Sequence, residues 1–161
     1  VIAFAPSNLM HGGFPYPNRP AWTFKNKPLT PFIQALCSQD EKLTEKEDLM
    51  LAMEKGLIPQ HANTQDDPCI LTDLFLARMR NNPIVQCTEI PVEKINCPIL
   101  LFSGDADAIW PSSIFAQALT DRLKKYNISI PYEHIAFAHA GHGFIAPYQT
   151  EYNRSIFHGV G

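Results

Sequence analysis

The sequence predicts an α/β fold with a mostly parallel sheet and helical crossovers, and three stretches of the chain carry this prediction. Residues 99–103 are a continuous apolar run, as in strands that are buried on both faces of a parallel sheet. Residues 111–126 carry apolar side chains at helical spacing, and residues 132–137 then read as another strand. A strand, a helix and a second strand in this order form the crossover unit of such sheets.

The first third of the chain predicts one strand, one long loop and one helix. Residues 1–6 are apolar and end in a proline, which predicts a buried strand followed by a turn. Residues 10–31 are dense in proline, glycine and aromatic residues, so we expect a surface loop without regular structure. Thr44 and Glu47 have the spacing of a capping box, which predicts a helix that ends before Gly56. Its apolar stripe consists of Leu49, Met50 and Met53.

The middle of the chain predicts a second helix and a connector. Apolar residues recur at helical spacing between Pro68 and Asn81, and the Asn-Pro pair that follows would end the helix. We expect residues 83–96 to form a polar connector to the strand at residues 99–103. Pro111 suits the first position of the helix that follows this strand.

Composition limits the classes of function that fit this chain. Its 161 residues suffice for one domain with a hydrophobic core, and we expect a single domain over residues 1–161. With 45% hydrophobic residues, 18% charged residues and a net charge of -3, it has neither a disordered composition nor a basic surface for nucleic acid. No apolar run approaches the length that spans a bilayer, so we expect no membrane partner.

The cysteines and the first residue bear on the compartment and on completeness. The four cysteines lie far apart and form no C-x-x-C pair, which argues against a zinc ribbon or a redox dithiol. Reduced thiols in a cytoplasmic protein are favoured over two disulfides, which remain the alternative. They are Cys37, Cys69, Cys87 and Cys97. Because the chain opens on a valine within an apolar run, we expect it to be a fragment of a longer protein.

Residues that could carry chemistry follow two of the predicted strands. In open α/β sheets, ligands bind beyond the carboxyl ends of the strands. Asp105 and Asp107 follow the strand at residues 99–103, and His139 and His142 follow the strand at residues 132–137. An acid loop and then a histidine loop match the chain order nucleophile, acid, base of one type of catalytic triad.

Four short motifs make the segment 98–147 similar to a known family. They are Gly104-Asp105-Ala106-Asp107, Trp110-Pro111-Ser112-Ser113, Arg122-Leu123 and Ala140-Gly141-His142. With them the segment resembles the C-terminal catalytic domain of acyl-CoA thioesterases and bile acid-CoA:amino acid N-acyltransferases. It is more distantly similar to dienelactone hydrolases and to prolyl-oligopeptidase-like serine hydrolases.

The resemblance implies a fold and two site residues. The chain would be the C-terminal portion of an α/β-hydrolase domain, with residues 17–93 as its variable loop and helical region and residues 98–147 as its acid and histidine loops. Asp107, three residues before a tryptophan, would be the triad acid, and His142 would be the base. The resemblance implies no cofactor and no metal.

The nucleophile of such a triad is not visible in this sequence. No G-x-S-x-G elbow occurs, so the resemblance places a serine or cysteine nucleophile upstream of Val1. Relatives also continue into a last helix beyond Gly161. Without a nucleophile and oxyanion donors, we expect the chain alone to be inactive. We also expect it to self-associate or to pair with a missing N-terminal half of the same protein.

Each candidate residue has a structural alternative. Asp107 could cap the helix near Pro111, and Asp105 is favoured to hold the turn through local backbone hydrogen bonds. We expect the other loop residues to be structural: His139 in packing, Trp110 in the core, Ser112 and Ser113 as helix caps.

Two further patterns offer weaker alternatives. Residues His11, Gly12 and Gly13 resemble the oxyanion motif of lipases, but that motif precedes a nucleophile elbow, and none follows here. His139 and His142 with the two aspartates could bind a divalent ion, although a glycine-rich loop holds such ligands poorly.

The sequence therefore predicts a serine-type hydrolase that acts on a small-molecule acyl thioester or ester, most similar to acyl-CoA thioester hydrolases. The alternatives are an acyl-CoA:amino acid N-acyltransferase, a dienelactone-hydrolase-like or peptidase-like hydrolase, and a non-catalytic α/β binding module. An upstream nucleophile elbow would favour the enzymes over the binding module.

Overall fold

The computed structural model describes residues 1–29, 31, 35–62, 64, 66–67, 69–80 and 88–143. The chain divides into two compact units, Val1–Asn8 with Pro91–Gly161 and Leu9–Ile90, which we call unit 1 and unit 2. Several residues named in the sequence analysis lie outside the described residues. They are Pro68 and Asn81, which bound the second predicted helix, together with Cys87 and residues 144–161. None of the helices in the described part of the chain is long and apolar enough to cross a bilayer.

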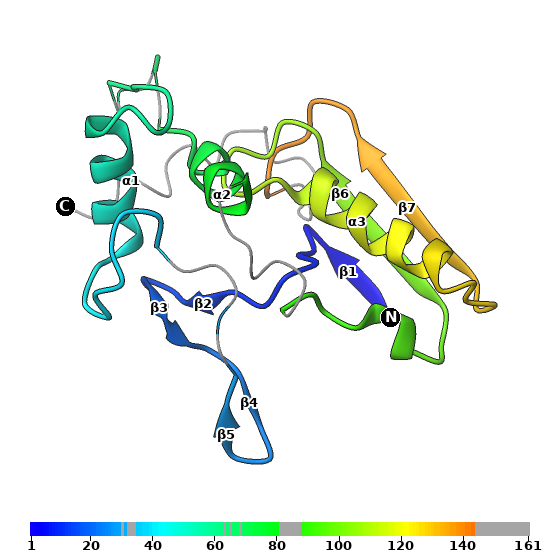
Figure 1. Cartoon of the computed structure of the whole chain (residues 1–161). Helices are drawn as coiled ribbons and strands as arrows, with labels where there is room; N and C mark the ends of the chain where they lie inside the picture. The colour runs from blue at the N-terminus through cyan, green and yellow to red at the C-terminus, as the bar shows by residue number, and fades with distance from the viewer. Residues whose placement is uncertain are drawn as a thin grey trace. The chain divides into compact units, whose positions relative to one another are not determined.

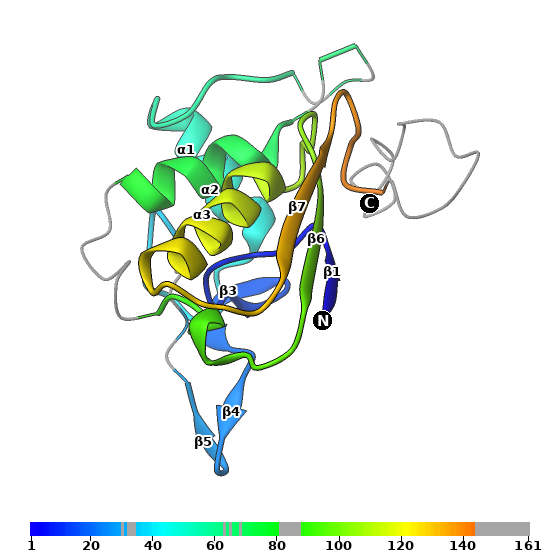
Figure 2. The same ribbon diagram turned by 90° about the vertical axis from the view of Figure 1, so that its right-hand side faces the viewer.

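Unit 1 is built on a three-stranded parallel sheet. Its strands are β1 (Ile2–Phe4), β6 (Ile99–Gly104) and β7 (Tyr132–Phe137), in the order β1-β6-β7. Helix α3 (Ser112–Lys125) connects β6 to β7 and lies along one face of the sheet (Figures 1 and 2). The short 3-10 helix η2 (Val92–Lys94) precedes β6. The predicted α/β architecture with a parallel sheet is therefore confirmed for unit 1.

The core of unit 1 lies between the sheet and α3. Alternate β6 residues point towards the helix, because successive side chains of a strand lie on opposite faces. The bidentate ion pair of Arg122 with Glu93, at 2.5 and 3.0 Å, joins α3 to η2 at the edge of this core. The buried apolar residues of the core are Val92, Ile99, Leu101, Ala116, Leu119 and Leu123.

The expectation that the strands are buried on both faces is wrong for this part of the chain. Ile2 is 65% exposed and Phe4 45% exposed, and Phe102 on the central strand is only partly buried. Within the described residues, α3 packs on one face of the sheet, and the other face carries a row of stacked rings. The ring centroids are 5.0 Å apart for Phe4 and Phe102 and 6.0 Å apart for Phe102 and Phe137.

The proline-rich stretch of unit 2 contains short strands, so the expectation of no regular structure is also wrong. Two antiparallel ribbons form, β2 (Gly12–Gly13) with β3 (Tyr16–Pro20) and β4 (Thr23–Phe24) with β5 (Lys27–Pro28). In a two-stranded ribbon every strand is an edge strand, where proline is tolerated because its missing N–H is not needed by a second neighbour.

The two predicted helices are confirmed with small changes. The capping box of Thr44 and Glu47 starts α1 (Glu45–Glu54), and Gly56 follows it with a φ of 65°. Met50 is 51% exposed and does not belong to the buried stripe, whereas Leu49 and Met53 do. The second helix is α2 (Leu71–Arg80).

A buried ion-pair cluster joins α1 to α2. The guanidinium of Arg78 bonds to the Glu45 carboxylate at 2.6 and 3.1 Å and to Asp48 Oδ2 at 2.7 Å. Asp48 also accepts the backbone amides of Leu36 and Cys37, each at 2.7 Å. The side chains of Arg78 and Asp48 are 2% and 0% exposed, so each charge depends on its partners.

We predict that Arg78→Ala lowers the free energy of unfolding of unit 2 by about 3–5 kcal/mol, because it leaves two carboxylates buried without their cation. Arg80→Ala, on the exposed side of the same helix, is the matched control and should change it by less than about 0.5 kcal/mol. Urea-induced unfolding, monitored by hydrogen exchange of the α1 and α2 amides, measures the free energy of unfolding of both variants. Equal effects of the two substitutions would contradict a role for the cluster.

Candidate functional site

The loops that follow β6 and β7 are held together by backbone hydrogen bonds. The Asp105 amide donates to Phe137 O at 3.1 Å, and the Ala106 amide donates to Ala140 O at 3.0 Å. These bonds continue the pairing of the two parallel strands past their carboxyl ends. The acid loop and the histidine loop therefore leave the sheet side by side.

Gly104 permits this close approach. A Cβ added at this position would lie 2.2 Å from Ala140 O and 2.8 Å from Gly141 O, which are backbone atoms that cannot move aside alone. Glycine commonly marks sites where two backbones approach closely. The sequence signal was present, a glycine at the end of a buried strand, but its reason was visible only in the structure.

Asp107 and His142 meet where the two loops end. The Nδ1 atom of His142 lies 2.9 Å from Asp107 Oδ2, and the side chains are 31% and 1% exposed. The other carboxylate oxygen, Oδ1, accepts the backbone amides of Ile109 at 3.0 Å and Trp110 at 3.2 Å. One oxygen thus fixes the acid loop, while the second binds the imidazole.

Trp110 supports the same arrangement from the side. Its ring lies edge to face with the His142 imidazole, with centroids 5.3 Å apart. Its indole Nε1 donates to Ala5 O at 3.1 Å, at the end of β1. Trp110 is partly buried rather than a pure core residue, and it contacts one of the two candidate site residues.

Asp107 takes the structural role in the turn that the sequence favoured for Asp105. Asp107, rather than Asp105, makes the local backbone hydrogen bonds of the turn. Asp105 is exposed, and its carboxylate accepts the Ser113 hydroxyl at 2.8 Å. Ser112 and Ser113 do not cap α3 either: the N-cap residue is Pro111, and the Ser112 hydroxyl contacts the backbone of Gly104. A local spacing argument could not assign these roles, because both aspartates can reach loop amides.

A chain of polar contacts runs from Asp105 into the sheet. Ser113 Oγ lies 2.9 Å from Ser103 Oγ, which lies 2.7 Å from His134 Nε2. Burial lowers the pKa of His134, against the opposing effect of the Asp105 carboxylate. Ser103 and His134 are a serine and a histidine in contact, but Ser103 is 0% exposed, so no substrate carbonyl can reach its hydroxyl.

The metal alternative receives no support from the geometry. Within the described residues, no three His, Cys, Asp or Glu side chains are arranged to hold a metal ion. His139 is exposed in a turn with a φ of 60°, so the expectation that it packs is wrong. His139 therefore lies at the surface and not in the core.

The lipase-like motif belongs to unit 2. The His11 ring lies edge to face with Phe75, with centroids 5.4 Å apart. Burial, together with the positive charge of Arg78, lowers the pKa of His11 to about 4, so the ring is neutral at pH 7. A Cβ at Gly12 would collide with the backbone of Pro17, so this glycine serves the tight β2–β3 ribbon.

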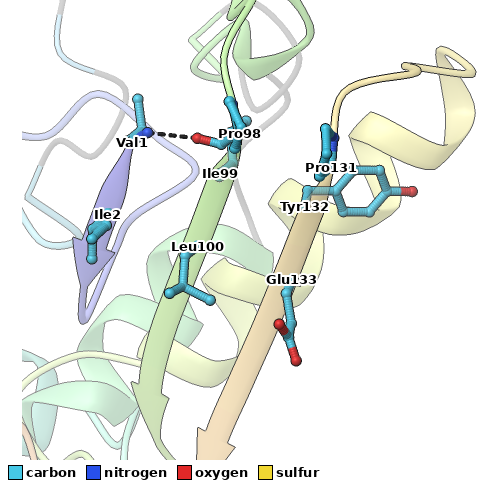
Figure 3. A pocket seen from close by; sticks show the side chains of 8 residues that line it. All are labelled: Val1, Ile2, Pro98, Ile99, Leu100, Pro131, Tyr132 and Glu133. Atoms are coloured by element: carbon cyan, nitrogen blue, oxygen red, sulfur yellow. Dashed lines mark hydrogen bonds between the residues drawn. The ribbon is translucent and has the colours of Figure 1, made fainter.

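An open hollow of about 430 Å³ lies at the opposite end of the sheet of unit 1, where the strands begin (Figure 3). Its walls are mainly apolar, and Glu133 is the one acidic side chain among the lining residues. The lining residues are Val1, Ile2, Pro98, Ile99, Leu100, Pro131, Tyr132 and Glu133. Histidine and serine are not among these eight described residues.

We predict that Gly104→Ala separates the two loops, because its methyl group would occupy the space of the Ala140 carbonyl. Overpacking of this kind costs about 1–3 kcal/mol. The amides of Asp105 and Ala106 should then exchange their hydrogens faster, as NMR can measure residue by residue. Gly13→Ala is the control, because its nearest neighbour would be Arg19 O at 3.8 Å. Unchanged exchange in Gly104→Ala would show that the loops do not depend on this contact.

Comparison with known proteins found a relative and a family. Part of the chain is similar to the peroxisomal succinyl-coenzyme A thioesterase of Mus musculus, with 31% identity over 78 residues. The matched part makes up 47% of this chain and spans 18% of the length of that relative.

A family model matches a much larger part of the chain. The model describes the C-terminal region of BAAT and acyl-CoA thioester hydrolases, and it matches residues 28–161. The match includes β6, α3 and β7, and with them both loops of the candidate site. The chain therefore belongs to the BAAT / acyl-CoA thioester hydrolase C-terminal family.

Proposed function

We propose that this chain supplies the acid and the base of an acyl-CoA thioester hydrolase that works through a nucleophile, His142 and Asp107. The observation that carries the proposal is the 2.9 Å contact between His142 Nδ1 and the buried Asp107 carboxylate. Membership of the family and the similarity to a thioesterase support the same class of reaction.

The proposed chemistry follows from the two nitrogen atoms of the imidazole. With Nδ1–H donating to Asp107, Nε2 keeps a lone pair and acts as the general base. It would take the proton of a serine or cysteine as that residue attacks the thioester carbonyl, and it would return the proton to the departing thiolate. Water would then release the acyl group by the same route.

The buried carboxylate stabilises the imidazolium that forms during each proton transfer. Asp107 has two amides on Oδ1, so it stays fixed while the charge on His142 changes. His142 is 31% exposed, which leaves its ring accessible from outside the loops.

We also propose the acyl acceptor, the substrate and the location. The acyl acceptor is water in a hydrolase and an amine in an acyltransferase, and we propose water because the matched relative is named a thioesterase. A cytoplasmic location and an acyl thioester as the small-molecule partner complete the proposal.

The test asks whether the upstream part of a relative can supply the nucleophile. This chain is joined behind the upstream part of the mouse succinyl-CoA thioesterase, and succinyl-CoA hydrolysis is followed by thiol release. We predict that Asp107→Asn lowers kcat by about three to four orders of magnitude, because the amide presents a donor to His142 and favours the wrong tautomer. Asp105→Asn is the matched control and should cost far less, since Asp105 contacts Ser113.

Several outcomes are informative. The chain alone should be inactive in the same assay, and His142→Ala in the fusion should be at least as impaired as Asp107→Asn. If Asp105→Asn abolishes turnover while Asp107→Asn remains active, the assignment of the acid is wrong. Full activity of His142→Ala would exclude the proposed base.

A further inference from the structure

The β4–β5 hairpin of unit 2 exposes aromatic and basic side chains together. All residues from 19 to 28 are exposed, and Figures 1 and 2 both show the hairpin extending away from β3. Trp22 is 61% exposed and Phe24 62% exposed. Exposing two large apolar rings to water is unfavourable, so we expect the surface that carries them to bind a partner.

The pairing of the hairpin places these side chains on one surface. Phe24 pairs with Lys27, and the Leu29 amide donates to Trp22 O at 2.8 Å, which continues the register. Directly opposed residues of an antiparallel pair share a face, so Trp22, Phe24 and Lys27 lie on the same side. Lys25 sits in the turn, with its Nζ 5.3 Å from the centre of the Phe24 ring.

The turn gives the hairpin a defined tip. Lys25 and Asn26 have φ values of 49° and 62°, the positive pair that two-residue hairpins of type I′ require. The tip therefore carries one lysine, with the second lysine beside it on β5.

The first 39 residues of the sequence contain basic residues but no acidic ones. Residues 1–39 contain Arg19, Lys25 and Lys27 but no aspartate or glutamate, although the whole chain has a net charge of -3. Asp40 and Glu41 lie beside Asn18 and Arg19 on β3, whereas the hairpin itself carries only cations. A hairpin of exposed rings and cations complements a partner that is both anionic and apolar.

We propose that the β4–β5 hairpin docks on an anionic lipid bilayer surface, with Trp22 and Phe24 entering the headgroup region and Lys25 and Lys27 contacting acidic headgroups. Tryptophan is enriched at membrane interfaces, and basic side chains are attracted to anionic leaflets. A stable protein interface buries about 800 Å² on each partner, more than a ribbon tip offers, whereas a bilayer presents a continuous flat surface.

This proposal differs from the expectation that no membrane is involved. That expectation rested on the lack of an apolar run long enough to span a bilayer. Side chains that bind only at the surface of a bilayer need no such run. The proposal also stands apart from the proposed hydrolysis, because it uses unit 2 alone.

The test measures binding of the chain to vesicles of phosphatidylcholine, with and without phosphatidylserine, by co-sedimentation. We expect binding to the anionic vesicles that weakens with added salt. Lys25→Gln with Lys27→Gln should weaken it about 25-fold, because each cation near an anionic surface contributes about fivefold. The matched control is Lys124→Gln with Lys125→Gln, which removes two exposed lysines beside Tyr126 on α3 and should leave binding unchanged.

The aromatic contribution is tested separately. Trp22→Ala with Phe24→Ala should weaken binding by about tenfold or more. Addition of anionic vesicles should shift the tryptophan fluorescence of the unaltered chain to shorter wavelength, and Trp22→Ala should abolish the shift although Trp110 remains. Circular dichroism confirms that the variants fold.

Three results would overturn the proposal. The first is no binding to anionic vesicles. The second is equal loss in the control pair, which would mean that net charge alone drives binding. The third is full binding after the aromatic substitutions, which would identify a general polyanion site such as one for nucleic acid.

Discussion

Everything at the candidate site depends on the close backbone contact between the loops that follow β6 and β7. Parallel strands end at the same edge of a sheet, but that alone leaves their loops free to diverge. Here two backbone hydrogen bonds hold the loops together, and Gly104 leaves room for the Ala140 carbonyl. Asp107 and His142 are 35 residues apart in the sequence and 2.9 Å apart in the structure because of this contact.

The second feature of the site is that the two oxygens of the Asp107 carboxylate have different partners. A buried carboxylate needs hydrogen-bond partners to offset the loss of water. Asp107 obtains them from two loop amides on one oxygen and from the imidazole on the other. Asp107 therefore holds the turn, a role expected for Asp105, and also contacts the histidine as predicted, whereas it does not cap α3. Substitutions at this position will disturb the loop as well as the imidazole, so thermal stability must accompany any activity measurement.

Sequence patterns predicted the elements of unit 1 because each has a strong local signal. The apolar run of β6, the periodic helix α3 and the strand β7 lie within a residue or two of their predicted bounds, as does the capping box of α1. Burial was harder to predict. Ile2 and Phe4 read as buried because apolar strands usually are, and their exposure depends on which elements cover the sheet. The buried Arg78 cluster depends on residues far apart in the sequence, and the turn role of Asp107 depends on loop geometry, so no local pattern specifies either.

We propose that Asp107 holds His142 with the proton on Nδ1 and the lone pair on Nε2. The direct measurement is the pair of ring ¹⁵N chemical shifts of His142 at a pH where the ring is neutral, assigned among the six histidines by comparison with His142→Ala. We expect a protonated Nδ1 and an unprotonated Nε2. A neutral ring with its proton mainly on Nε2, leaving Nδ1 without a hydrogen to donate to Asp107, would contradict it.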